Sequence, residues 1–129
     1  MTARGRVLAE RFEVLGRVGA GGMGAVFRAT DRRTGKIVAL KELHASGVED
    51  NERFARECDF LAALDVPGVG RHIAHGVSPE GARYLVMEWV DGPSLSQELK
   101  RRSVSVNDSV EIAIGVAQIL AAIHARGIV

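Results

Sequence analysis

The sequence is poor in cysteine, proline and aromatic residues, and it carries almost no net charge. Its 129 residues include one cysteine, three prolines and 5% aromatic residues, and the formal net charge is +1. A single cysteine excludes an internal disulfide and favours a reducing compartment, so we expect a cytoplasmic protein. The near-neutral charge gives no electrostatic case for nucleic-acid binding. What is present, 47% hydrophobic and 26% charged residues, is typical of one globular domain.

Long hydrophobic runs are also missing. The N-terminal residues contain no apolar run of the length that a signal peptide needs. The most apolar stretch, Ile112 to Ile123, is shorter than the roughly 17 residues that cross a bilayer, and Gln118 interrupts it. We therefore expect no membrane segment in this chain.

The lone cysteine, Cys58, falls in a helical pattern and is expected to be a small buried hydrophobe.

The pattern of apolar residues predicts strands in the first part of the chain and helices in the last. Asp50 and Asn51 are typical of caps before the first helix. Asp91-Gly92-Pro93 marks the change from strands to helices, and we place a boundary there. The expected strands are 12–18, 25–30, 36–43, 71–77 and 82–90, and the expected helices are 52–64, 95–100 and 108–126.

A glycine cluster, Gly19-x-Gly21-x-x-Gly24, follows the first expected strand. A dinucleotide-binding fingerprint would need a helix directly after it, but the residues that follow are strand-like. A Walker loop fails too, because Gly35-Lys36 is followed by Ile37. Two interpretations remain: a hairpin turn whose backbone lies close over phosphates, or a plain flexible hairpin.

Lys41 stands late in the β-branched run Val38-Ala39-Leu40-Lys41. Strand parity predicts that Ile37, Ala39 and Lys41 share one face. If that face lines a pocket, Ala39 is small enough to admit a flat base and Lys41 can reach phosphate oxygens. The alternative is a surface lysine at a strand end.

Glu57 places a carboxylate on an otherwise apolar helical stripe, where a carboxylate requires a cation. Lys41, one short loop upstream, is the candidate, so we predict a Lys41–Glu57 ion pair that holds the ammonium toward phosphates. Glu52 and Asp59 are rival partners of Lys41 by charge, but they fall off the stripe. The other members of the stripe are Phe54, Leu61 and Leu64.

Taken in order, these motifs resemble the eukaryotic-type protein kinases, and residues 21–27 and 84–92 are similar to the bacterial serine/threonine branch. The resemblance covers Arg11 to Val129. It implies an α+β fold: a kinase-like N-lobe of a five-stranded antiparallel sheet and one control helix, followed by the first two helices of an incomplete α-helical C-lobe. Residues 1–10 would be an N-terminal extension, 11–90 the ATP-binding N-lobe, and 91–129 the hinge exit and the start of the C-lobe.

The resemblance also implies the site. Lys41 would contact the α- and β-phosphates of ATP and Glu57 would anchor it, with glycine amides over the phosphates. Met87 would be the gatekeeper, and main-chain groups of Glu88 and Val90 would bind the adenine edge. Ser94 stands where many relatives place an acidic ribose contact. The implied nucleotide-binding residues are Val18, Gly19, Gly21, Gly22, Gly24, Val26, Ala39, Lys41, Met87, Glu88 and Val90.

The family's His-Arg-Asp catalytic loop and Asp-Phe-Gly magnesium site do not occur in these residues. We expect the ligands of Mg²⁺ beyond residue 129, none in this chain, and no phosphate transfer by these residues alone. The expected function is the ATP-binding part of a serine/threonine kinase that acts on a protein substrate. The alternative is a catalytically dead module that binds nucleotide or pairs with another kinase chain.

Overall fold

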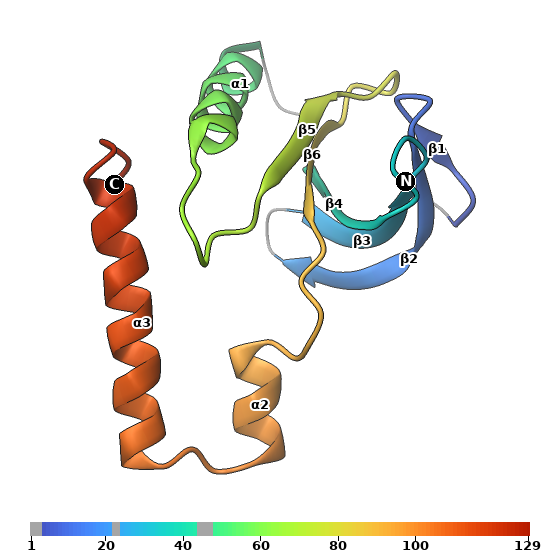
Figure 1. Cartoon of the computed structure of the whole chain (residues 1–129). Coiled ribbons are helices and arrows are strands. Elements are labelled where there is room, and N and C mark those ends of the chain that lie inside the picture. The colour runs from blue at the N-terminus through green and yellow to red at the C-terminus, as the bar shows by residue number, and fades with distance from the viewer. Residues whose placement is uncertain (1–3, 22–23, 44–47) are drawn as a thin grey trace. The chain divides into compact units, whose positions relative to one another are not determined.

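The computed structural model describes residues 4–21, 24–43 and 48–129. The chain divides into two compact units. The first comprises Met1–Leu64 and Gly70–Trp89, and the second comprises Asp65–Val69 and Val90–Val129. The first unit contains a sheet and a helix, and the second contains two further helices (Figure 1).

The first unit is built on an antiparallel sheet with six strands among the described residues, in the order β1-β2-β3-β4-β6-β5. The helix α1 packs beside β5 (Figure 1). The sheet and helix confirm the predicted α+β fold. The elements are β1 (Val7–Leu8), β2 (Phe12–Gly21), β3 (Gly24–Asp31), β4 (Ile37–Leu43), α1 (Val48–Ala63), β5 (His72–Val77) and β6 (Arg83–Glu88).

The strand β1 was not among the five predicted strands. It has two residues, too few to show any periodicity, and it pairs with the start of β2. The tight turn between them places Ala9 and Glu10 at φ 54° and 56°, which glycine or asparagine usually occupies. Because neither residue is a turn former, the sequence carried no signal for this strand.

One face of the sheet forms the main hydrophobic core. Alternate residues of β4 show the pattern, because Val38 and Leu40 are fully buried whereas Lys41 is exposed. The sheet is curled (Figure 1), and Arg6 beside β1 pairs with Glu80 in the turn between β5 and β6. The buried residues of this core are Leu8, Phe12, Val14, Phe27, Ala29, Val38, Leu40, Tyr84 and Val86.

The helix α1 packs on the opposite face. Phe54 and Cys58 are buried and pack against Leu85 of β6. Cys58 is 1% exposed, which matches the expected core role, and burial raises the pKa of its thiol to about 11. The helix begins at Val48, so Asp50 and Asn51 lie inside it and the prediction that they cap it was wrong.

The corner after β3 is held by a buried charge. The Asp31 carboxylate accepts hydrogen bonds from Arg11 Nε and Nη2 at 2.9 and 2.8 Å, and from the Arg33 amide at 3.0 Å. These Arg11 hydrogen bonds lower the pKa of Asp31 below its ordinary value. Gly35, at φ 73°, donates its amide to the Asp31 carbonyl oxygen at 2.7 Å. The predicted polar turn is therefore fixed by a buried ion pair.

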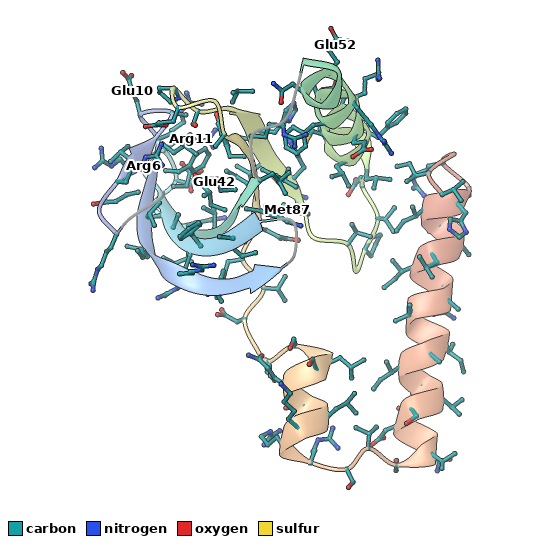
Figure 2. All side chains as sticks on the ribbon, turned by 180° about the vertical axis from the view of Figure 1, so that it is seen from behind. Arg6, Glu10, Arg11, Glu42, Glu52 and Met87 are labelled. Carbon is teal, nitrogen blue, oxygen red and sulfur yellow. The ribbon has the colours of Figure 1, made fainter. Side chains whose placement is uncertain are left out.

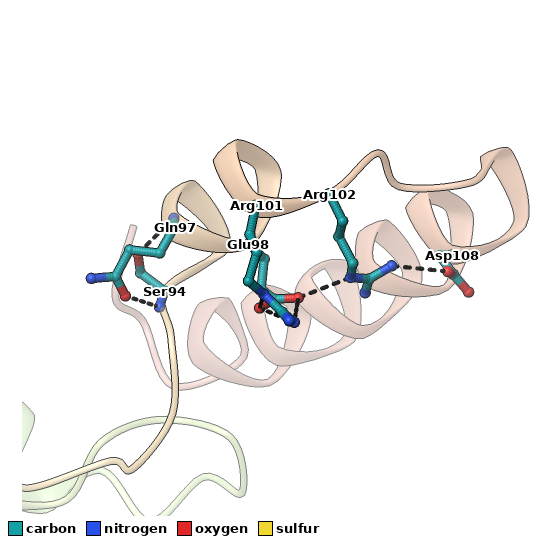
Figure 3. Close-up of polar contacts among 6 residues, drawn as sticks. All are labelled: Ser94, Gln97, Glu98, Arg101, Arg102 and Asp108. Carbon is teal, nitrogen blue, oxygen red and sulfur yellow. Dashed lines mark hydrogen bonds and ion pairs between the residues drawn. The ribbon is translucent and has the colours of Figure 1, made fainter.

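The second unit contains α2 (Leu95–Arg101) and α3 (Val106–His124). Ser94 and Gln97 form a reciprocal capping box at the start of α2, with bonds of 3.1 and 2.8 Å (Figure 3). Ser105 caps α3 by accepting from the Asp108 amide at 3.1 Å.

The helix α3 is apolar and none of its residues is buried. Its 19 residues contain the apolar stretch Ile112 to Ile123, and they begin and end two residues before the predicted bounds 108–126. By length and composition alone it could cross a membrane, a criterion that core helices of soluble proteins also meet. A helix apolar on several sides is typical of one that packs against further elements.

Candidate functional site

Strand register places the predicted lysine on the face that α1 packs on. Val26 of β3 pairs with Lys41 of β4, and Lys41 pairs with Leu85 of β6. Residues directly opposite one another in antiparallel strands share a face. Leu85 is covered by α1, whereas Lys41 is exposed. The lysine therefore lies just beyond the covered part of this face.

A second row of the same face carries the small residue predicted beneath a base. Ala39 pairs with Arg28 on one side and with Met87 on the other. Met87 is partly buried against the cluster under α1. Ala39 thus forms a shallow position between two longer side chains, and the structure brings Val26, Ala39, Lys41 and Met87 onto one face, as strand parity predicted for Ala39 and Lys41.

The glycines of the predicted phosphate turn have different environments. A Cβ on Gly24 would stand 2.1 Å from the carbonyl oxygen of Glu42, closer than any real contact, so glycine is required there by strand packing alone. A Cβ on Gly19 would meet nothing within 4 Å. Gly21 ends β2, and Gly22 lies outside the described residues. Packing therefore explains why residue 24 is a glycine, but it does not explain why residue 19 is one.

The predicted Lys41–Glu57 ion pair is not present in this structure. Glu57 instead accepts from Arg53 Nε at 3.2 Å, and its side chain is 61% exposed. The physical reason is the rotation of α1: the residues that fill the interface are Phe54, Cys58 and Leu61, which leaves Glu57 on the flank of this stripe.

The Arg53–Glu57 pair is a weak restraint on the glutamate. An exposed pair at this helical spacing contributes about 0.3–0.5 kcal/mol. Of the rival acids, Glu52 projects away from the sheet (Figure 2) and Asp59 lies 3.8 Å from His75 Nε2. Glu57 therefore stays a predicted site residue, but the predicted ion pair between Glu57 and Lys41 is not formed.

The last residue of β6 and the segment after it include the predicted adenine-binding groups. The amide of Glu88 donates to the Arg71 carbonyl oxygen at 2.9 Å, and its carboxylate accepts from the Arg71 amide at 2.9 Å. Glu88 is therefore anchored on both its backbone and its side chain. Val90 is the first residue of the segment Val90–Val129 of the second unit, and Val18 of β2 is 55% exposed.

Two histidines of β5 form a polar cluster that sequence reasoning missed. A β-bulge between His72 and Ala74 turns His72 and His75 to the same face, where His72 Nε2 lies 2.8 Å from His75 Nδ1. Burial lowers the pKa of His72. Simple alternation would have placed the two rings on opposite faces, so only the bulge could have revealed the cluster.

No site for a metal ion is formed by the residues that the structure describes. Within 4–21, 24–43 and 48–129, no group of three or more His, Cys, Asp or Glu side chains could hold one. A pocket of about 430 Å³ lies between β1 and the β5–β6 turn, and its lining contains none of the predicted site residues.

Comparison with known proteins gives a family match over nearly the whole chain. The family model described as "Protein kinase domain" matches residues 12–129. Serine/threonine-protein kinase pkn2 of Myxococcus xanthus is 38% identical over 95% of this chain and 15% of its own length. Serine/threonine-protein kinase PknA of Mycobacterium tuberculosis is 35% identical over 97% of this chain and 31% of its own length.

A solved structure agrees with these sequence matches. The kinase domain of Mycobacterium tuberculosis PknI is 28% identical and superposes with a TM-score of 0.84, over 98% of this chain and 53% of that domain structure. The chain therefore spans about half of the solved domain and less than a third of either of these two curated relatives.

Proposed function

Because the chain belongs to the protein kinase domain family, we propose that it is the ATP-binding part of a serine/threonine protein kinase. The complete enzyme would transfer the γ-phosphate of ATP to serine or threonine side chains of a protein. Residues 11–90 form the nucleotide-binding lobe in this proposal, and residues 91–129 begin the second lobe. We also propose a cytoplasmic location, from the single cysteine.

The observation that carries the proposal is the uncovered part of one sheet face. Val26, Ala39 and Lys41 share that face, and Lys41 is exposed beside two small apolar side chains. In the proposal, Lys41 binds phosphate oxygens, while Val18, Val26, Ala39 and Met87 surround the base. The remaining contacts come from glycine amides of 19–24 and from main-chain groups of Glu88 and Val90.

Glu57 is proposed as the residue that orients Lys41 when nucleotide is bound. The exposed pair with Arg53 is weak, and α1 would also have to rotate before Glu57 leaves the flank of its stripe and turns inward. Mg²⁺ neutralises phosphate charge when bound, and we propose that its ligands lie beyond residue 129.

We propose that residues 1–129 alone bind nucleotide but do not transfer phosphate. Losing a catalytic base alone typically costs 100- to 10,000-fold in rate. This sequence also lacks the Asp-Phe-Gly segment that holds magnesium in the family.

The test is Lys41→Met in the complete gene product that contains this chain. Phosphate transfer from ATP to a protein substrate should fall at least about 100-fold, as when one preorganised charge-stabilising donor is lost. Lys36→Met is the matched control, because it removes the same charge from the exposed β3–β4 turn. Equal activity of Lys41→Met and the unmodified enzyme would refute the assignment.

A further inference from the structure

An arginine of β3 covers the only tryptophan of the chain. The guanidinium carbon of Arg28 lies 5.8 Å from the centroid of the Trp89 ring, within the range of a cation–π contact. Trp89 follows directly after β6 and is the single tryptophan among the 129 residues. Both residues belong to the first unit.

The register of the sheet explains how the two side chains meet. Arg28 pairs with Ala39, and Ala39 pairs with Met87, two residues before Trp89. Because the side chain between them is only a methyl group, the long arginine can pass over Ala39 toward the end of β6. The contact therefore borders the position proposed for the base.

The peptide bond between Glu88 and Trp89 is anchored from both sides. On one side, Glu88 exchanges two hydrogen bonds of 2.9 Å with the backbone of Arg71. On the other side, the Arg28 guanidinium lies over the Trp89 ring. A peptide unit is planar, so fixing the residues at its two ends fixes the direction of the Glu88 carbonyl between them.

We propose that Arg28 is a positioning residue for the nucleotide base, and that it acts by holding Trp89 and thereby aiming the Glu88 carbonyl. This inference rests on the proposed ATP site, which assigns that carbonyl to the adenine edge. The planar guanidinium suits the role because it stacks on an aromatic face, whereas a lysine ammonium is a compact, strongly hydrated charge.

The experiment compares two ligands on the 129-residue chain, with Trp89 emission as the internal probe. MgATP contains the base, and magnesium tripolyphosphate contains only the phosphates. In Arg28→Leu the dissociation constant for MgATP should rise two- to five-fold, the size expected for an exposed cation–π contact. The dissociation constant for tripolyphosphate should change no more in Arg28→Leu than in the control Arg33→Leu. The control removes the same charge from the exposed turn.

Two further measurements separate the stack from a general loss of structure. Arg28→Leu should shift the emission of Trp89 and raise its quenching by acrylamide, while circular dichroism stays unchanged. Arg28→Lys keeps the charge and should reproduce most of the loss of MgATP affinity. If Arg28→Leu does not fold, Arg28→Lys still tests the effect on MgATP affinity.

Each other outcome has a definite meaning. Unchanged MgATP affinity in both Arg28 variants would overturn the positioning role, whatever Trp89 emission does. An equal loss for MgATP and tripolyphosphate would overturn it in favour of a general structural effect. If the unmodified chain binds neither ligand, the proposed ATP site fails first and the role of Arg28 fails with it.

Discussion

The two faces of the antiparallel sheet are covered by other residues to different degrees. On one face, Phe12, Leu40 and Val86 are at most 1% exposed and belong to one continuous core. The other face is covered by α1 where Leu85 lies, and Lys41 beside it is exposed. Both faces come from the same strands, because successive residues point to opposite sides.

The difference separates residues that hold the fold from residues that are available for chemistry. The closed face uses its side chains to exclude water. The open part of the other face presents a charge that no packing requires. Substitutions on the first face should therefore change stability, and those on the second should change function with little effect on stability.

The sharpest test of this comparison uses two adjacent residues of β4. Leu40 is fully buried, so Leu40→Ala should lower the free energy of unfolding by about 2–5 kcal/mol. Lys41→Ala should change it by less than about 0.5 kcal/mol, as for an exposed position. Urea unfolding of the 129-residue chain, followed by circular dichroism, measures both. Similar losses for the two variants would show that the faces do not differ in this way.

The glycines offer a second test, with a smaller expected effect. Gly24→Ala would place a Cβ 2.1 Å from the Glu42 carbonyl oxygen, so β3 and β4 must separate. We expect a loss of about 1–3 kcal/mol in the free energy of unfolding, the range for overpacked sites. Gly19→Ala is the matched control, because its Cβ meets nothing within 4 Å. A Gly19→Ala chain as destabilised as Gly24→Ala would contradict the comparison.

The regular parts of the fold could be predicted because their residues alternate in a recognisable pattern. Ile37 to Leu43 alternates between buried and less buried positions, and the polar residues after Asp31 predicted the turn that joins β3 to β4. The strand β1 could not be found this way, since two residues have no period and the turn after them uses Ala9 and Glu10 at positive φ.

The candidate site was only partly predictable, for a different reason. Strand parity placed Ala39 and Lys41 on one face, because parity depends on local backbone geometry alone. The bond between Lys41 and Glu57 depends on how far α1 is rotated, and that is decided by the packing of Cys58 against Leu85. A sequence stripe specifies a face to within about one residue on either side, so a flank position such as Glu57 cannot be assigned from it.

The smallest expected effect concerns the buried ion pair of Asp31 and Arg11, which belongs to the closed side. Asp31 is 1% exposed and bound to Arg11. Asp31→Asn removes the charge at nearly constant volume, and we expect a loss of about 1–2 kcal/mol in the free energy of unfolding at pH 7. Asp65→Asn, at an exposed position, is the control for a changed net charge.

The dependence on pH identifies the cause of that loss. The pKa of Asp31 is lowered in the folded chain, so its contribution to stability is complete above the ordinary aspartate value of about 3.9 and disappears as pH falls through the lowered value. The difference in urea midpoint between the unmodified chain and Asp31→Asn should therefore shrink as pH is lowered from 5 toward 2 (about the range over which such a carboxylate titrates). A difference that stays constant over this range would mean that Asp31 acts through its shape and neutral hydrogen bonds, and the corner would then need no charge to hold it.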